Sequence, residues 1–181
     1  MNKLLNLAVG VVVALALPIG VLAQETAAEP EVERIANGQK FGAWTVTCEA
    51  IAVNETACVL SQRLVRSSDD AFLAELLAFW SGDGSQTYFA ARVPNGVFFP
   101  SGFAFRADES EDRKDFAWQS CSREICEALL TLSMEEIEAL EGAESLIAGY
   151  RPNLALQPAV FRLSIDGAVE GLTALKSLSE Q

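Results

Sequence analysis

The chain has 181 residues, of which 50% are hydrophobic, and its formal net charge is −12. This length allows one domain with a sizeable core. The acidic balance argues against nucleic acid as a partner, because phosphates are bound by Lys and Arg, and it disfavours docking on an anionic lipid surface. Histidine is absent, which excludes a Ser-His-Asp triad, a Cys-His dyad and an HExxH zinc helix.

The first 23 residues predict a secretory signal peptide. Lys3 precedes the unbroken apolar run Leu7–Leu17, Pro18 interrupts the helix, and Val21–Ala23 places small residues where a signal peptidase cleaves. We therefore predict cleavage after Ala23, export to the periplasm or cell surface, and no membrane span in the mature chain. An uncleaved anchor is the alternative, but the apolar segment is shorter than the ~20 residues of a spanning helix.

Residues 24–39 are polar and acidic, and they predict a flexible segment outside the core. Residues 40–178 are expected to form one domain. Its first element is Phe41–Leu60, which has the pattern of strand, loop and strand with a cysteine on each arm. Trp44 falls on the same strand face as Cys48, so we expect it to pack in the core.

Four cysteines remain after cleavage, and an even count in an exported chain predicts two disulfides. Three connectivities are possible. The local one, Cys48–Cys58 and Cys121–Cys126, is favoured because each pair can lie on the arms of one turn. A zinc site or a redox pair is the alternative, but CxxC motifs are absent, so no metal or cofactor is predicted.

The middle of the chain contains one ambiguous element between two turn regions. Gln62–Asp70 is mostly polar and predicts a loop, and Ser81–Ser85 predicts a turn. Between them, Ala71–Trp80 fits a helix capped by Asp70 as well as a strand that is buried on both faces.

Short apolar segments and turns then alternate at regular spacing, which is typical of an antiparallel meander or sandwich. The expected strands are Thr87–Val93, Phe103–Arg106, Phe116–Cys121 and Cys126–Leu132, with turns at Pro94–Gly96 and Pro100–Gly102 and a solvated loop at Asp108–Asp115.

The last part of the chain predicts two helices and two strands. Ser133 and Glu136 form a capping box, so a helix should start there, reach about Leu140 and stop at Gly142. The remaining expected elements are a strand at Ser145–Tyr150, a strand at Leu154–Leu163 interrupted at Pro158, and a helix at Ala168–Leu178.

These residues together resemble the bacterial invasion-associated locus B family. The resemblance rests on five short motifs: Phe41-Gly42-x-Trp44-x-Val46-x-Cys48, Cys58-x-Leu60-x-Gln62, Val93–Val97 with Pro100-x-Gly102, Phe116-x-x-x-x-Cys121 with Cys126-x-Ala128, and the closing segment Phe161–Leu175. It implies an exported, single-domain, mainly β protein: an immunoglobulin-like antiparallel β-sandwich with one or two short helices and two disulfides. It also implies a strand at Ala71–Trp80.

Three functional hypotheses remain open. The first is a non-enzymatic binding module with an unknown protein or envelope partner, in which Phe98, Phe99, Phe103 and Phe105 form an exposed patch; the alternative is that these aromatics are core. The second is a hydrolase that uses carboxylates such as Asp83, Asp108 or Asp112. The third is an envelope stress or structural protein with no dedicated ligand. The family is named for host-cell entry, but no matched motif carries that role.

Overall fold

Ten antiparallel strands form one strongly curled sheet in the part of the chain that the structure describes. The structure is a computed structural model, and it describes residues 35–53, 55–107, 112–143 and 145–179. The predicted signal peptide lies outside the described residues, which all belong to the compact unit Glu33–Gln181. The elements are β1 (Lys40–Phe41), β2 (Trp44–Ala52), β3 (Glu55–Val65), β4 (Phe72–Trp80), β5 (Thr87–Pro94), a 3-10 turn η1 (Phe99–Ser101), β6 (Phe103–Ala107), β7 (Lys114–Cys121), β8 (Ile125–Leu132), α1 (Met134–Glu141), β9 (Leu146–Tyr150), β10 (Ala159–Leu163) and α2 (Ala168–Ser179).

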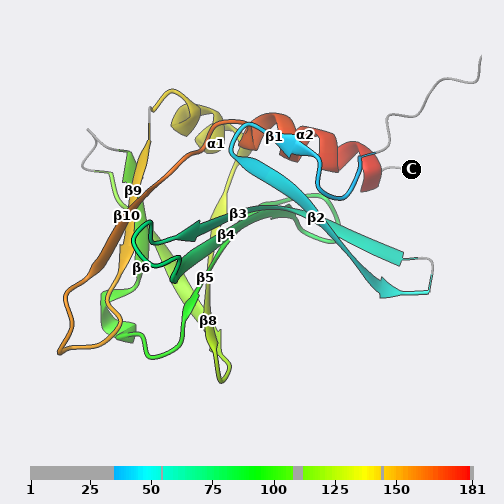
Figure 1. The fold of residues 1–181 in the computed structure, drawn as a ribbon. Coiled ribbons are helices and arrows are strands. Elements are labelled where there is room, and N and C mark those ends of the chain that lie inside the picture. Colours follow the sequence, from blue (N-terminus) through cyan, green and yellow to red (C-terminus); the bar gives the residue numbers. More distant parts are fainter. Residues whose placement is uncertain (1–34, 54, 108–111, 144, 180–181) are drawn as a thin grey trace, which may run out of the picture. The chain divides into compact units, whose positions relative to one another are not determined.

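The strand order is β1-β2-β3-β4-β5-β8-β7-β6-β9-β10. Strand β7 connects two parts of the sheet. Its first residues, Lys114–Phe116, pair with β6, and its second half pairs with β8. The sheet therefore forms a curled half-barrel, with β6, β9 and β10 on one side of the core and β3 to β5 on the other (Figure 1). This confirms the expected class: a mainly β, antiparallel, sandwich-like fold with two helices and two disulfides.

The core forms where alternate side chains of both layers point inward. In β5, Phe89, Ala91 and Val93 are buried, whereas Tyr88 and Arg92 point to the outer face. Trp44 is fully buried and meets Phe89 edge to face, with 5.9 Å between ring centroids. The hydroxyl of Tyr150 on β9 donates to the carbonyl of Leu73 on β4 at 3.3 Å and so connects the two layers.

The ambiguous segment Ala71–Trp80 is a strand, β4, as the family resemblance implied. Ala74, Leu76 and Ala78 face the core, while Leu77 on the opposite face is only 7% exposed. Burial on both faces explains why its periodicity resembled that of a helix. Asp70 does not cap a helix; it lies before β4 with a left-handed φ of 54°.

The expected loop at Gln62–Asp70 is wrong in its first part, because β3 continues to Val65. The polar residue Gln62 points inward and is only 9% exposed. Its Nε2 donates to the carbonyl of Ser164 at 2.9 Å, and its Oε1 accepts from the amide of Ser164 at 3.2 Å. A polar side chain is tolerated here because the chain after β10 supplies its hydrogen-bond partners.

Two glycines allow the start and the end of the domain to touch. Gly42 has φ +52° and Gly167 has φ +83°, and a Cβ at Gly167 would lie 2.3 Å from the carbonyl carbon and oxygen of Phe41. The amide of Ala43 donates to the carbonyl of Asp166 at 3.1 Å across this contact. We call this region, formed by residues 41–44, Gln62 and 164–171, the closure.

Both predicted helices are present and lie together (Figure 1). α1 begins with the expected capping box of Ser133 and Glu136 and ends at Gly142. α2 packs on β4, where Trp80 Nε1 donates to the carbonyl of Leu172 at 2.7 Å. A Cβ at Gly171 would come within 2.7 Å of the Leu60 side chain, so glycine there permits the close approach of the helix.

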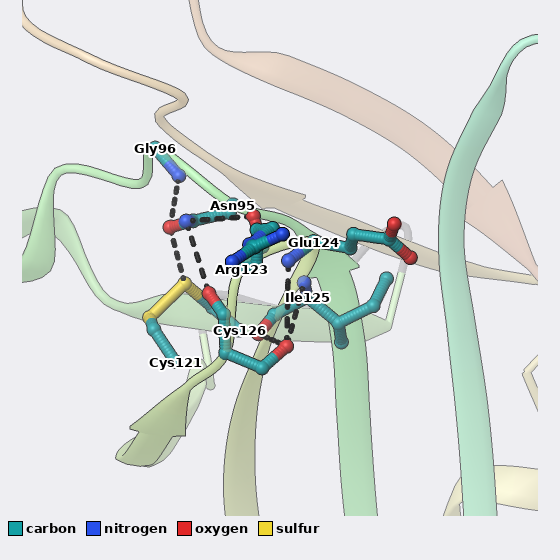
Figure 2. The surroundings of a disulfide bond; sticks show 8 residues. Asn95, Gly96, Cys121, Arg123, Glu124, Ile125 and Cys126 are labelled. Atoms are coloured by element: carbon teal, nitrogen blue, oxygen red, sulfur yellow. Dashed lines mark hydrogen bonds between the residues drawn. A yellow bond between two sulfur atoms is a disulfide. The ribbon is translucent and has the colours of Figure 1, made fainter.

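The two disulfides have the local connectivity, Cys48–Cys58 and Cys121–Cys126. Figure 2 shows how Asn95 organises the second one: its Nδ2 donates to the carbonyls of Ser122 and Arg123 at 3.0 and 3.2 Å. Its Oδ1 lies 3.4 Å from Cys126 Sγ, a contact in which no hydrogen is shared because a disulfide sulfur carries none. Asn95 belongs to the Val93–Val97 motif, so that motif has a structural role.

Three other boundaries differ from expectation. The segment expected outside the core contacts it from Ile35, which packs against the core, and its Gly38 amide donates to the Val46 carbonyl at 2.8 Å. The acidic loop ends earlier, because β7 already starts at Lys114. The last strand starts only at Ala159, since Pro152 and Pro158 bracket a turn in which Asn153 Oδ1 accepts two backbone amides.

Candidate functional site

An open hollow of about 340 Å³ lies on the outward face of β6, β9 and β10. Its floor is formed where Ala104 of β6 pairs with Gly149 of β9, and Gly149 pairs in turn with Val160 of β10. A Cβ at Gly149 would lie 2.7 Å from the carbonyl oxygen of Ala159. The small side chains therefore leave the sheet backbone near the surface, and larger neighbours form the walls.

Three arginines line this hollow, Arg106, Arg113 and Arg151, and no acidic residue is among its lining residues in the described chain. We call it the arginine hollow. Arg113 is held by Asp115 at 2.7 Å and by the carbonyl of Ser101 at 3.1 Å. Arg151 donates through Nε to the carbonyl of Leu156 at 3.3 Å, and no described carboxylate forms an ion pair with it. The Arg151 guanidinium is therefore positioned by the backbone and suited to an external anion.

Four exposed apolar side chains line the arginine hollow or lie on the segments that line it: Val160 lines it directly, one side chain lies in η1 beside Ser101, and two lie in the turn between Arg151 and Pro158. They are Phe99, Leu154, Leu156 and Val160, which are 54%, 64%, 51% and 65% exposed. The Phe98 amide donates to the carbonyl of Arg151 at 2.8 Å and ties η1 to the β9–β10 turn. We call these four residues the rim. Together, the hollow and the rim form an apolar surface that contains arginines. This surface also includes one edge of the sheet, because β10 is the last strand in the strand order.

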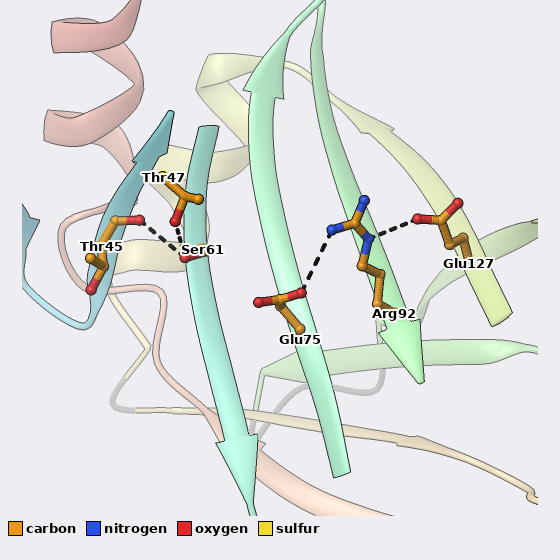
Figure 3. A network of polar contacts seen from close by, with 6 residues as sticks. All are labelled: Thr45, Thr47, Ser61, Glu75, Arg92 and Glu127. Carbon is orange, nitrogen blue, oxygen red and sulfur yellow. Dashed lines mark hydrogen bonds and ion pairs between the residues drawn. The ribbon is translucent and has the colours of Figure 1, made fainter. Parts of the chain in front are cut away.

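The outward face of β4, β5 and β8 presents a second polar arrangement (Figure 3). Arg92 pairs with Glu127 at 2.7 Å and with Glu75 at 3.7 Å across three adjacent strands. Beside them a depression of about 770 Å³ carries both signs of charge. Because these charges already neutralise one another, this depression is less suited than the arginine hollow to bind a charged ligand.

A hydroxyl cluster lies farther along the same face (Figure 3). The hydroxyls of Thr47 and Ser61 are 3.0 Å apart, and Ser61 Oγ donates to the carbonyl of Thr45 at 3.2 Å. No described side chain in this cluster is a base that could remove a proton from Ser61, and the chain has no histidine. We interpret the cluster as a cross-strand hydrogen-bond network.

The aromatic patch expected from the sequence is only partly at the surface. Phe103 and Phe105 are 0% and 2% exposed and belong to the core, where Phe103 packs edge to face on Phe116 with 4.9 Å between ring centroids. Their inclusion in an exposed patch is therefore wrong; both occupy inward positions of β6. Phe98 is half-buried, and Phe99 is exposed and meets Trp118 edge to face.

The carboxylates considered for hydrolysis are not assembled into a catalytic pair by any described contact. Asp83 is exposed in the β4–β5 turn, and hydrogen bonds from the hydroxyls of Ser81 and Ser85 lower the pKa of its carboxyl to about 2. It is therefore ionised at neutral pH and cannot act as a general acid. Asp112 is exposed, and Asp108 lies outside the described residues. The described residues also contain no group of three or more Cys, Asp or Glu side chains that could hold a metal ion.

Sequence reasoning missed most of the surface that the structure brings together. The strand expected at Leu154–Leu163 includes Leu154 and Leu156, which instead lie in the β9–β10 turn, whereas Val160 does lie on a strand, β10. The available signal was the pair Pro152 and Pro158, which excludes the residues between them from a regular strand and places both leucines in solvent. Arg151 follows a buried strand and had no sequence pattern to mark it.

The curled antiparallel sheet and its two local disulfides define a disulfide-stapled, mainly β domain. No helix in the described part of the chain is long and apolar enough to cross a membrane. The chain belongs to the invasion associated locus B (IalB) protein family, whose model matches residues 44–176.

Among solved structures, the crystal structure of invasion associated protein B from Bartonella henselae is similar to this chain. The TM-score is 0.64 at 16% sequence identity, and the match covers 78% of this chain and 96% of the other. At this identity the similarity establishes the fold alone. A comparison with curated proteins gave no match.

Proposed function

We propose that this protein is an exported, non-enzymatic interaction module that binds a protein partner through the arginine hollow and its rim. One observation carries the proposal: of the seven exposed large hydrophobic side chains of the described residues, Val160 lines the arginine hollow and three more lie on the η1 and β9–β10 segments that contribute its lining residues Ser101, Arg151 and Pro158. Protein interfaces are enriched in aromatic residues and arginine, and exposed apolar side chains that gather in one place are typical of binding surfaces.

The energetics of this surface favour a macromolecular partner over a small buried ligand. The hollow is open, and its rim residues project outward from η1, the β9–β10 turn and β10. Burying such side chains on association contributes about 25 cal/mol per Å² of apolar area removed from water. The backbone that carries the rim is held by hydrogen bonds from the Phe98 amide to the Arg151 carbonyl and from the Leu156 amide to the Asn153 carbonyl, so little backbone order has to be gained on binding.

Export is part of the same proposal. The predicted cleavage after Ala23 would deliver the chain to the periplasm or cell surface, where oxidising conditions allow both disulfides to form and persist. The partner would then belong to the cell envelope or to a host cell. Fractionation followed by intact-mass measurement tests this step, and we expect an extracytoplasmic chain that starts at Gln24 with four oxidised cysteines. A cytoplasmic chain that retains Met1–Ala23 would contradict it.

The binding step is tested by site-specific photo-crosslinking in the native organism. A photoreactive residue at Val160 should give a discrete adduct, and one at Val65 should not, although Val65 is 45% exposed. The double substitution Leu154→Ser with Leu156→Ser should abolish the adduct formed from position 160. Equal adducts from both positions, or an adduct that survives the double substitution, would refute this surface as the binding site.

A further inference from the structure

The same molecule carries a second exposed apolar group at the opposite end of the strand order. Ile51 and Val53 near the end of the β2–β3 hairpin are 60% and 93% exposed. Two exposed carboxylates, Glu49 and Glu55, flank them. We call Glu49, Ile51, Val53 and Glu55 the hairpin tip. Its composition is apolar and acidic, whereas the arginine hollow is apolar and basic.

The hairpin tip is held in a fixed position. Cys48 and Cys58 are direct cross-strand partners and are joined by a disulfide, and pairing continues beyond them to Ala52 and Glu55. From residue 49 to residue 52 every side chain of β2 is exposed, so this part of the hairpin extends past the core. A stapled hairpin loses little conformational entropy when it binds.

The hairpin tip cannot reach the arginine hollow of its own molecule. β2 and β3 lie near one end of the strand order, and β9 and β10 lie at the other. Figure 1 shows the hairpin pointing away from β6, β9 and β10. Any contact between these two complementary surfaces must therefore join two molecules.

We propose that the arginine hollow of one copy takes the hairpin tip of a second copy. This inference rests on the proposed function, because it names the partner of the same surface. Ile51 and Val53 would pack against the rim, and a tip carboxylate would meet the guanidinium of Arg151, which has no carboxylate partner among the described residues. The contact is head to tail: each copy uses different surfaces on its two sides, so the assembly grows into chains or closes into rings.

The decisive experiment uses two variants that are each defective on one side. Ile51→Asp with Val53→Asp disables the tip, and Arg151→Glu with Val160→Asp disables the hollow. Sedimentation velocity of the protein purified after export should show that the unmodified chain associates as concentration rises from about 1 μM to about 1 mM. Each variant alone should stay monomeric, with an apparent Kd raised at least about tenfold.

A one-to-one mixture of the two variants should form a dimer and nothing larger, because only one intact tip and one intact hollow remain per pair. Val65→Asp is the matched control and should associate like the unmodified chain. Circular dichroism of each variant confirms that it is folded. A monomeric unmodified chain, a variant that still associates alone, or a mixture that stays monomeric would each overturn the proposal.

These outcomes are separable from those of the proposed function. If the adduct formed from position 160 contains a different protein while the unmodified chain stays monomeric, the interaction surface stands and self-docking fails. If the unmodified chain associates and Arg151→Glu with Val160→Asp associates equally well, the arginine hollow is not the surface through which the copies associate. Association that weakens when salt is raised from about 0.05 M to about 0.5 M supports the ionic part of the contact.

Discussion

In both the closure and the arginine hollow, a glycine lets backbone approach backbone closely, but the structural result differs between the two regions. In the closure, Gly42 and Gly167 bring the two ends of the domain into close contact, and Gln62 reinforces it through hydrogen bonds to Ser164. In the hollow, Ala104 and Gly149 leave a gap that stays open to solvent. The motifs that carry the family resemblance specify residues of the closure. None of their specified positions lines the hollow.

This difference separates what family membership explains from what it leaves open. The closure explains the first motif, because Gly167 lies against Phe41 and Gly42. It also explains the second motif, because Leu60 contacts α2 at Gly171 and Gln62 accepts a hydrogen bond from the Ser164 amide. These motifs therefore specify a fold. A binding partner would be selected at positions that the motifs do not fix, so membership of the family does not by itself assign a partner to this chain.

The largest effect is expected for a side chain placed inside the closure. Gly167→Ala should destabilise the domain by about 3–5 kcal/mol, because the new Cβ would meet the Phe41 backbone, which cannot move aside. Gly84→Ala is the matched control. Gly84 also has a positive φ, +67°, but open space surrounds it, so only backbone strain of about 1–2 kcal/mol should appear. Urea unfolding measures both, and equal losses would disprove the close contact.

A smaller loss is expected for Gln62→Leu. The substitution leaves the partly buried Ser164 amide and carbonyl without their partner, at a cost of about 1–2 kcal/mol. Gln119→Leu is the control, since Gln119 is exposed and its Nε2 bonds only to the nearby Ala117 carbonyl. Its loss should stay below about 0.5 kcal/mol. If both variants unfold at the same urea concentration, the Gln62 hydrogen bonds do not hold the closure.

The sequence predicted the disulfides and the helices far better than the closure or the hollow, for a physical reason. Cysteine pairs, a capping box and an amphipathic helix leave local signals, and each was found within a few residues of its true bounds. Gln62 was misread as loop because its partners are 102 residues away, and polarity alone cannot show that a buried amide will be satisfied. The hollow depends on neighbours from β6, β9 and β10, and on which of Phe99 and Phe103 points outward, so no single stretch of sequence contains it.

A still smaller, pH-dependent effect is expected at α1, outside both regions. The hydrogen bond from Lys114, with help from the Ser133 backbone, holds the pKa of the Glu136 carboxyl below its usual value of 4.5. A lowered folded-state pKa means that this charge stabilises the fold above the unfolded pKa, and that the contribution is lost as pH falls through the folded value.

Glu136→Gln should therefore lower stability at pH 7 by less than about 1 kcal/mol, because more than a third of the Glu136 side chain is exposed and solvent screens the pair. The difference from the unmodified chain should shrink as the pH is lowered to about 3. Glu138→Gln on the exposed side of the same helix is the control. Urea unfolding at stepped pH gives the free energy of unfolding of each variant. A difference between Glu136→Gln and the unmodified chain that grows on acidification would contradict the prediction.

The smallest effect on stability is expected in the rim, and this completes the contrast with the closure. Leu154→Ser with Leu156→Ser should change the free energy of unfolding by less than about 0.5 kcal/mol per site, because both side chains are already more than half exposed. The same variant should lose the crosslinked adduct formed from position 160. If these apolar side chains can be removed without cost to the fold, the stability of the fold does not require an apolar surface here. If the double variant instead lost as much free energy of unfolding as Gln62→Leu, these leucines would contribute to the core. The proposal of a binding surface around the hollow would then lose its support.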